Sequence, residues 1–521
     1  MSIQLSHLPL DLAMFAALIG GILMGYPVSF TLAGVATVFA FLGYAFGAFD
    51  LSLLGALSQR VFGLITNDVL IAIPLFVFMG VVLEKSQIAE DLLETMGRLF
   101  GSIRGGLGVS VMLVGALLAA STGIVGATVV AMGLIALPTM LRNGYSPSLS
   151  CGVVCTSGTL GQIIPPSTLL IILADVMSNA YQQAQFSQGK FSIDTISVGQ
   201  MFAAAFVPGL LLVTIYIVYL LISARLMPSI APPMRELTVK PTRREILGAV
   251  VPPVLLIFAV LGSILGGVAT PSEAASVGAV GAVMMAGARL GLSTRVIVIG
   301  AIAFVLLAIA AGTLPVRLQR DDTNPSDIVL AIFYTVLVVV GVVAVLRSLK
   351  KLGNSARLKP ALDSTLTITS MIFATILTAS IFSLVFVGLG GGERIESILT
   401  AMPGGAIGAL VFCMLLIFIL GFFLDFVEIT VIVLPLIAPV LILMGHDPMW
   451  LAVLIAINLQ TSFLTPPFGF SLFYLRGAAP KEITTGQIYR GVIPFIALQA
   501  IGIFLIWLFP RIATWLPGQL Y

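Results

Sequence analysis

Two groups of oxygen-bearing side chains lie inside apolar stretches of the sequence, each just ahead of a Pro-Pro pair. Three sit before or beside Pro466-Pro467 and two precede Pro165-Pro166; they are Ser157, Thr159, Asn458, Thr461 and Thr465. Proline lacks a backbone N–H and clashes with the preceding turn, so each pair frees carbonyl oxygens within an apolar segment. Such oxygens suit a hard cation, and Na⁺ needs no imidazole or thiolate ligand. The spacing predicts a Na⁺ site beside each pair; alternatively, these side chains bond carbonyls of their own helices or hold helices together.

An interruption also precedes each group within a longer apolar run. Residues 105–141 and 406–443 each predict two apolar helical legs joined by a tip that is not regular helix. The tips contain Ser121, Thr122 and Gly123 in the first run, and Gly421 and Asp425 in the second, with Glu428 one turn further. Both runs are therefore interpreted as re-entrant helical hairpins, which bring polar backbone to the middle of an apolar layer.

The composition places these groups in a membrane protein. Of 521 residues, 59% are hydrophobic and 9% are charged, whereas a soluble domain carries about 25% charged residues. Apolar runs long enough to cross a hydrocarbon core of about 30 Å recur from end to end. This excludes soluble, disordered and nucleic-acid-binding proteins, and no P-loop or acid–base constellation indicates an enzyme. We expect an all-α polytopic membrane protein that binds no nucleic acid and is not an enzyme.

The acids at the second tip stand out in a sequence with so few charges. A carboxylate at membrane depth costs at least a few kcal/mol, so its presence there indicates a role. We predict that Asp425 and Glu428 bind substrate and that Asp425 is also an ion ligand; the alternative is that these carboxylates are paired structurally or are reached by cytoplasmic or external water. The other predicted substrate-binding residues are Ser121, Thr122, Ser157 and Thr461. The other predicted ion ligands are Gly123, Ser157, Gly158, Thr159, Gly421, Asn458, Thr461 and Thr465. The glycines contribute backbone oxygens in this interpretation, and serve close packing in the alternative.

Polar breaks divide the remaining chain into spans. We predict apolar spans at 8–25, 27–46, 68–83, 198–224, 246–266, 271–288, 296–314, 327–346, 364–388 and 491–509, and broken spans at 148–178 and 449–475. Residues 51–65 are moderately amphipathic, and 84–103 predicts an amphipathic helix along the interface. Residues 390–402 form a further short segment, and 179–197 is predicted to be a polar loop.

Basic residues set the predicted orientation. The loops 225–245 and 347–359 together hold 10 of the 25 Lys and Arg residues, so the positive-inside rule places both in the cytoplasm. Both termini then lie outside, and the basic loops are positioned to contact anionic membrane lipids. No basic residue precedes Arg60, so we expect the first apolar segment to be retained rather than cleaved as a signal peptide.

The sequence contains an internal repeat. Pro138, Gly144, Pro147 and Pro165-Pro166 reappear 301 residues later as Pro439, Gly445, Pro448 and Pro466-Pro467, without a gap. The predicted orientation puts Arg142 of the first copy inside and His446 of the second outside. The copies are therefore predicted to be inverted, which places their broken segments together near the membrane midplane, where secondary transporters bind substrate and ions.

These motifs resemble those of a known family. The run Ser157-Gly-Thr-Leu-Gly161, followed by Ile163-Ile-Pro-Pro-Ser167, is similar to the large membrane subunit of TRAP transporters, and so are Gly421-x-x-Leu-Asp425, Asn458, Thr465-Pro-Pro-x-Gly469 and Thr270-Pro-Ser-Glu273. The resemblance implies an elevator-type importer in the bacterial inner membrane, driven by Na⁺. It also implies a small four-helix membrane subunit and a periplasmic binding protein that delivers an organic acid anion. The sequence departs from the family at the first tip and in the helical pair 296–346, which resembles an insertion.

The resulting division of the chain alternates scaffold and transport segments. The two transport-domain repeats are residues 105–197 and 404–486. The scaffold consists of N-terminal helices with an interfacial arm at 1–104, helices at 198–295, and a second-half scaffold helix with its interfacial arm at 347–403. The extra helical pair is 296–346, and a C-terminal helix is 487–521. A single-component Na⁺/carboxylate symporter with related hairpins is the alternative transporter. A channel or a structural membrane subunit is the alternative from another class.

Overall fold

Helices make up the ordered architecture of this chain. The computed structural model describes residues 9–234, 241–314 and 325–521, except for the side chains of Ser121 and Thr122, and no strand occurs in these ranges. Eight of the described helices are long and apolar enough to cross a membrane, or up to ten if each of two bent pairs is one span. The structure is thus that of a polytopic helical membrane protein.

The first half of the chain contains the first hairpin and the first broken helix. Its elements are α1 (Leu10–Leu23), α2 (Val28–Ala45), η2 (Leu51–Gly55), α3 (Ala56–Ile65), α4 (Asp68–Lys85), α5 (Ile88–Phe100), α6 (Gly106–Thr122), α7 (Val125–Arg142), α8 (Pro147–Thr159), η3 (Leu160–Gln162), α9 (Thr168–Ser187) and α10 (Val198–Leu226). Here α6 and α7 form the predicted hairpin, and α8 and α9 are the two parts of the broken helix.

The second half repeats this order after an added set of helices. Its elements are α11 (Arg243–Ala249), α12 (Val251–Leu265), α13 (Pro271–Arg289), α14 (Thr294–Thr313), α15 (Pro325–Asn354), α16 (Leu358–Gly388), α17 (Gly391–Thr400), α18 (Gly405–Leu420), α19 (Phe426–Ile432), α20 (Leu434–Leu443), α21 (Pro448–Leu464), α22 (Phe470–Ala478), α23 (Thr485–Leu508), α24 (Arg511–Thr514) and α25 (Pro517–Leu520). The second hairpin consists of α18 with α19 and α20, and the second broken helix consists of α21 and α22.

Equivalent elements of the two copies make equivalent contacts. The half-helix α9 packs on α20 of the second hairpin, and its counterpart α22 packs on α7 of the first. In the centre, Gln460 Nε2 donates to Thr159 Oγ1 at 3.3 Å. These two residues are 301 positions apart, the repeat offset, and a direct contact between equivalent residues lies on the axis that relates the copies. The Thr159–Gln460 pair therefore marks a pseudo-two-fold axis.

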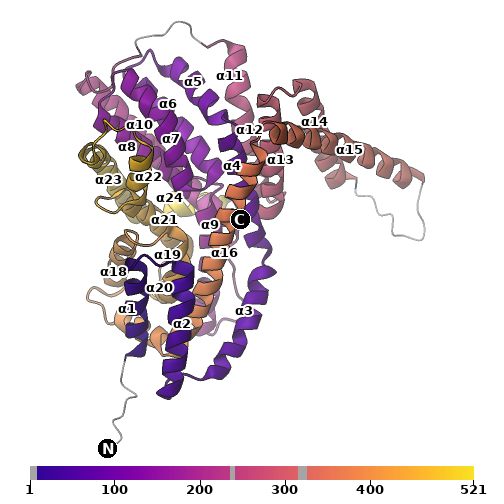
Figure 1. Cartoon of the computed structure of the whole chain (residues 1–521). Coiled ribbons are helices and arrows are strands. Elements are labelled where there is room, and N and C mark those ends of the chain that lie inside the picture. The colour runs from indigo at the N-terminus through magenta and orange to yellow at the C-terminus, as the bar shows by residue number, and fades with distance from the viewer. Residues whose placement is uncertain (1–8, 235–240, 315–324) are drawn as a thin grey trace, which may run out of the picture.

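The arrangement in space agrees with an inverted repeat. In Figure 1, α6 and α7 occupy the half of the body that also holds α5 and α11, whereas α18 and α20 occupy the opposite half, which also holds α1 and α2. The hairpins thus approach the centre from opposite ends. The pair α14 and α15 extends sideways from α13 and away from the body (Figure 1), and most of its surface is exposed and apolar.

One predicted loop is wrong. Residues 179–187 continue α9 as helix instead of beginning the polar loop 179–197. Gln185 explains the error: it is polar in sequence, yet its side chain is buried and bonds both the N–H and the carbonyl of Asp194. These two hydrogen bonds hold the chain around Asp194 against the end of α9, which allows a glutamine-rich segment to remain helical.

Ion pairs tie the short helix in front of each hairpin to the scaffold. In the first half, Asp91 on α5 pairs with Arg289 on α13. In the second half, Arg394 on α17 pairs with Asp11 of α1, whose side chain is buried. The helix α5 is followed directly by α6, and α17 is followed directly by α18. Each ion-paired helix therefore holds the start of one hairpin against the scaffold.

Close packing of α8 against α23 gives a first testable prediction. A Cβ added at Gly491 would overlap the carbonyl of Ser148, and one added at Gly152 would overlap the carbonyl of Gly491. Backbone cannot yield as a flexible side chain can, and overpacking costs about 1–3 kcal/mol or more. Gly491→Ala is therefore expected to lower the apparent unfolding temperature in detergent, measured by fluorescence-detected size-exclusion chromatography. Gly486→Ala, at an open position of the same helix, is the control; equal unfolding temperatures for the two variants would refute the prediction.

Candidate functional site

The tip of the first hairpin rests on the break between α8 and α9. Gly123 ends α6 in the left-handed region with φ +62°, and a Cβ there would lie 2.8 Å from Thr168 Oγ1 and 2.9 Å from Thr168 N. On the other side, a Cβ at Gly161 would lie 2.8 Å from the carbonyl oxygen of Ala119. The tip and the break thus touch backbone to backbone, because glycine stands at both contacts.

The other predicted oxygen ligands of the first repeat lie on α8, which packs against both legs of the hairpin. Ser157, Gly158 and Thr159 are all buried on α8. Ser157 Oγ donates to the carbonyl of Val154, and Thr159 Oγ1 donates to that of Thr156. Each hydroxyl therefore donates its single proton within its own helix and keeps its oxygen as an acceptor, and the Thr159 oxygen accepts from Gln460.

The threonine hydroxyls of the second repeat also donate to backbone carbonyls of the preceding turn. Thr461 Oγ1 donates to the carbonyl of Ile457 at 2.8 Å, and Thr465 Oγ1 donates to that of Thr461 at 2.7 Å. Asn458 Nδ2 donates to the carbonyl of Met414 on α18 at 2.7 Å, which joins the broken helix to its hairpin. The side chains bond carbonyls, as the alternative interpretation expected, and still present oxygen acceptors.

The predicted glycines occupy close contacts. A Cβ at Gly158 would overlap Val129 of α7, and one at Gly421 would overlap the Ser462 hydroxyl. Packing alone therefore accounts for both glycines, and the assignment of their carbonyls as ion ligands stays a prediction. Ser121 and Thr122 end α6, and their side chains lie outside the described residues.

Several buried polar atoms beside the breaks have no hydrogen-bond partner in the described part of the chain. They are Thr156 Oγ1, Thr168 Oγ1, Gln460 Oε1, and both Nε2 and Oε1 of Gln162. A buried polar group without a partner costs about 1–3 kcal/mol, so such a group normally faces a water, an ion or a ligand. The oxygens in this set fit a hard cation, and no three His, Cys, Asp or Glu side chains converge within the described ranges.

These four residues were missed by the sequence-based assignment, although a signal existed. The 301-residue offset aligns Thr159 with Gln460, and Gln162 is a polar residue between Gly161 and the apolar Ile163. Both features could have added the glutamines to the candidate list.

The two predicted acids form a reciprocal cap at the start of α19. Asp425 is the N-cap residue: its Oδ1 accepts from the N–H of Phe426 at 2.7 Å, and its N–H donates to Glu428 Oε2 at 2.9 Å. Both side chains are partly exposed. The structural pairing that was the alternative is thus present, as a capping box that engages Asp425 Oδ1 and Glu428 Oε2.

Helix ends give the tips their electrostatic character. The N-cap residues of α7, α9 and α22 make no side-chain cap hydrogen bond; they are Ile124, Ser167 and Gly469. The first N–H groups of these helices therefore present positive potential. The C-termini of α6, α8, α18 and α21 point into the same breaks with negative potential. Each tip therefore offers ends that favour an anion beside ends that favour a cation, whereas the N-terminus of α19 is neutralised by its own acids.

Tyr474 on α22 lies against the first hairpin beside its tip. A Cβ at Gly126, the second residue of α7, would lie 2.8 Å from Tyr474 Cζ. The second broken helix thus contacts the first hairpin where its second leg begins.

Comparisons with known proteins agree on one family. The family described as "Tripartite ATP-independent periplasmic transporter, DctM component" matches residues 15–318 and 293–512. The C4-dicarboxylate TRAP transporter large permease protein DctM of Vibrio cholerae is 27% identical over 97% of both chains. The sialic acid TRAP transporter large permease protein of the same organism is 23% identical over 96% of both chains. The ectoine TRAP transporter large permease protein of Halomonas elongata is 26% identical over 96% of this chain and 98% of that one.

A solved structure shares the fold. The crystal structure of the YdaH transporter of Alcanivorax borkumensis superimposes with a TM-score of 0.52 over 98% of each chain, at 12% identity. At this identity the similarity concerns the arrangement of the helices alone.

Proposed function

Since this chain belongs to the DctM family of tripartite ATP-independent periplasmic transporters, we propose that it imports an organic acid anion across the bacterial inner membrane, driven by an inward Na⁺ gradient. The chain is a large permease subunit of a TRAP transporter and not an enzyme. C4-dicarboxylates and sialic acid, named for two relatives, are organic acids. The observation that carries the proposal is the pair of glycine-tipped hairpins resting on Pro-Pro-broken helices, with helix ends of both signs at each contact.

Na⁺ is the proposed coupling ion because the donors at both breaks are neutral oxygens. Ser157, Thr159, Asn458, Thr461 and Thr465 supply hydroxyl or amide oxygens, and Gly123, Gly158 and Gly421 supply backbone carbonyls. The partnerless Gln162 and Gln460 oxygens add to this set. In secondary transporters, unwound carbonyls and half-helix C-termini hold the coupling ion while N-termini face the anionic substrate.

The acids of the second tip explain why the ion and the anion depend on each other. Asp425 and Glu428 repel a substrate anion held at the uncapped N-termini of α7 and α22. A cation beside Asp425 lowers that repulsion, so each solute raises the affinity for the other by the same factor. The proposed substrate contacts are Ser121, Thr122, Ser157 and Thr461, and Asp425 and Glu428 take part in the substrate site through the cation beside Asp425.

The proposed movement is of the elevator type. The two hairpins, taken as re-entrant, and the two broken helices form the mobile body, because they pack crosswise on each other through α9–α20 and α22–α7. The arms α5 and α17 are ion-paired to the scaffold and hold the frame. A small four-helix membrane subunit and a periplasmic binding protein complete the proposed transporter.

Uptake by proteoliposomes tests the proposal. The complex of this chain with its small subunit is expected to accumulate a labelled organic acid only with an inward Na⁺ gradient and a matching binding protein, and replacing Na⁺ by K⁺ is expected to reduce the initial rate to background. A panel of C4-dicarboxylates, sialic acid and their cognate binding proteins gives the first substrates. Uptake that persists in K⁺ would refute the proposed Na⁺ coupling. Uptake by this chain alone would refute the proposed requirement for a small subunit and a binding protein.

A further inference from the structure

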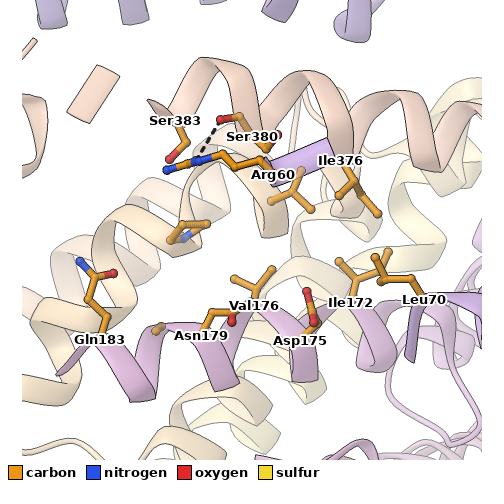
Figure 2. A pocket seen from close by; sticks show the side chains of 13 residues that line it. Arg60, Leu70, Ile172, Asp175, Val176, Asn179, Gln183, Ile376, Ser380 and Ser383 are labelled. Atoms are coloured by element: carbon orange, nitrogen blue, oxygen red, sulfur yellow. Dashed lines mark hydrogen bonds between the residues drawn. The ribbon is translucent and has the colours of Figure 1, made fainter. Parts of the chain in front are cut away.

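A polar cavity lies away from the hairpin tips, between scaffold and transport segments. It has a volume of about 230 Å³, and its polar lining comprises Arg60, Asp175, Asn179, Gln183, Ser380 and Ser383. Figure 2 shows Arg60, Ser380 and Ser383 on one wall and the α9 residues on the facing wall. Arg60 belongs to α3, whereas the serines belong to α16. In the predicted orientation, α3, α9 and α16 all have their extracytoplasmic ends near this cavity.

Arg60 supplies a positive charge that forms no ion pair with the described residues. Its Nη1 donates to the backbone carbonyl of Ser380 at 3.1 Å, which is a neutral acceptor. It takes part in none of the ion pairs found within 4.0 Å across the described ranges. A guanidinium has five N–H donors, so most of them remain available. Inside a membrane protein, such an arginine usually marks the path of a substrate or ion.

The facing wall determines where an anion is held. Asp175 is fixed on its side of the cavity, because Asn67 Nδ2 of the α3–α4 bend donates to its Oδ1 at 2.9 Å. Its negative charge disfavours an anion on that side and favours the Arg60 side. The amides of Asn179 and Gln183, one and two turns further along α9, are neutral groups that can donate to the same anion.

The size and the donors indicate the class of ligand. A guanidinium beside hydroxyl and amide donors matches the planar carboxylate group, which it binds through two parallel hydrogen bonds. The volume is below the roughly 300–1,000 Å³ of pockets for drug-sized ligands. The donors and the volume therefore fit a small carboxylate.

We propose that this cavity is an extracytoplasmic vestibule in which Arg60 holds the carboxylate of a small organic acid before it reaches the hairpin tips. The assignment rests on the proposed function, since it places a waiting position on the route of the same anion. It adds a residue of α3, which belongs to the scaffold, to the residues that determine substrate affinity.

Chemical protection tests the site without transport. Phenylglyoxal modifies exposed arginines, and the rate at Arg60 is read by peptide mass spectrometry in reconstituted protein. Succinate at 50 mM is expected to slow modification of Arg60 at least about 5-fold while leaving Arg511, exposed on the same predicted side, unchanged. The measurement is made in phosphatidylcholine and in phosphatidylglycerol vesicles, because a lipid headgroup also carries an oxyanion. Protection by phosphatidylglycerol alone, or no protection by succinate, overturns the proposal.

Paired charge variants test its role in transport. Arg60→Gln is expected to raise the KM for uptake about 10-fold, the loss of one charged hydrogen-bonding partner, with Vmax within about twofold. Asp175→Asn removes the opposing charge and is expected to lower KM, whereas Arg511→Gln leaves it unchanged. An unchanged KM in Arg60→Gln overturns the vestibule. The proposed function depends on a different result, the Na⁺ dependence of wild-type uptake, and stands or falls with that result alone.

Discussion

Replacing Asp425 with asparagine is expected to weaken the apparent affinity for Na⁺ about 10- to 100-fold, because a hydrogen bond or ligand contact to a charged group contributes about 1.5–3 kcal/mol. Asparagine caps a helix as well as aspartate does, so α19 keeps its start and the protein keeps its unfolding temperature. The measurement is the Na⁺ dependence of uptake in proteoliposomes. The substitution thus separates the charge of Asp425 from its capping role.

Two further variants complete this test. Asp425→Ala loses both roles and is expected to cost about 1 kcal/mol of stability in addition. Asp447→Asn is the matched control, because Asp447 caps α21 in the same manner, with Oδ1 accepting from the N–H of Trp450 at 2.8 Å. If Asp425→Asn retains the wild-type Na⁺ dependence and only Asp425→Ala is destabilised, the acid is a helix cap and nothing more.

The second large effect is expected at the first hairpin tip. Gly123→Ala places a methyl group against Thr168 and imposes φ +62° on an L-residue, which costs about 1–2 kcal/mol by itself. The tip must lift from the break, and a displacement of about 1 Å at a site that positions reacting groups can cost about 100-fold in rate. We expect a loss of Na⁺-dependent uptake of about 10- to 100-fold, measured as the initial rate per reconstituted molecule.

Strain and collision can be distinguished by a control elsewhere in the chain. Gly189 has φ +71° and nothing within 4 Å of an added Cβ. Gly189→Ala therefore carries the same backbone strain without the collision and is expected to transport like the wild type. Equal losses in both variants would show that the contact between the tip and Thr168 has no role in transport.

Much of the architecture was predictable because its determinants act locally. The prolines at 165–166 and 466–467 break their helices wherever they are placed, and Gly123 permits a left-handed turn through its own backbone. The repeat was visible because five such residues kept one offset. The predicted hairpins and broken helices accordingly match α6–α7, α8–α9, α18–α20 and α21–α22 within a few residues, apart from the extension of α9 to Ser187.

The candidate site was predictable only in part. The acids at the second tip were identified from their rarity, yet the pattern Asp425-x-x-Glu428 also matches a capping box, and the structure shows that cap. Gln162, Gln460 and Thr168 were not selected, because polar side chains inside an apolar run have the same appearance whether or not they find a partner. Arg60 could not be assigned, since its cavity is formed with residues of α9 and α16 that lie more than 100 and more than 300 positions away.

The sequence by itself determined the membrane class, the repeat, the broken segments and the resemblance to TRAP permeases, because composition and backbone-breaking residues need no partner to take effect. Only the tertiary structure decided that Thr159 meets Gln460 on the pseudo-two-fold axis, that Gly123 touches Thr168, and that Arg60 faces Asp175 across a cavity. Each of these is a contact between distant segments, and its existence depends on how closely two helices approach. That distance is set by packing across the whole molecule.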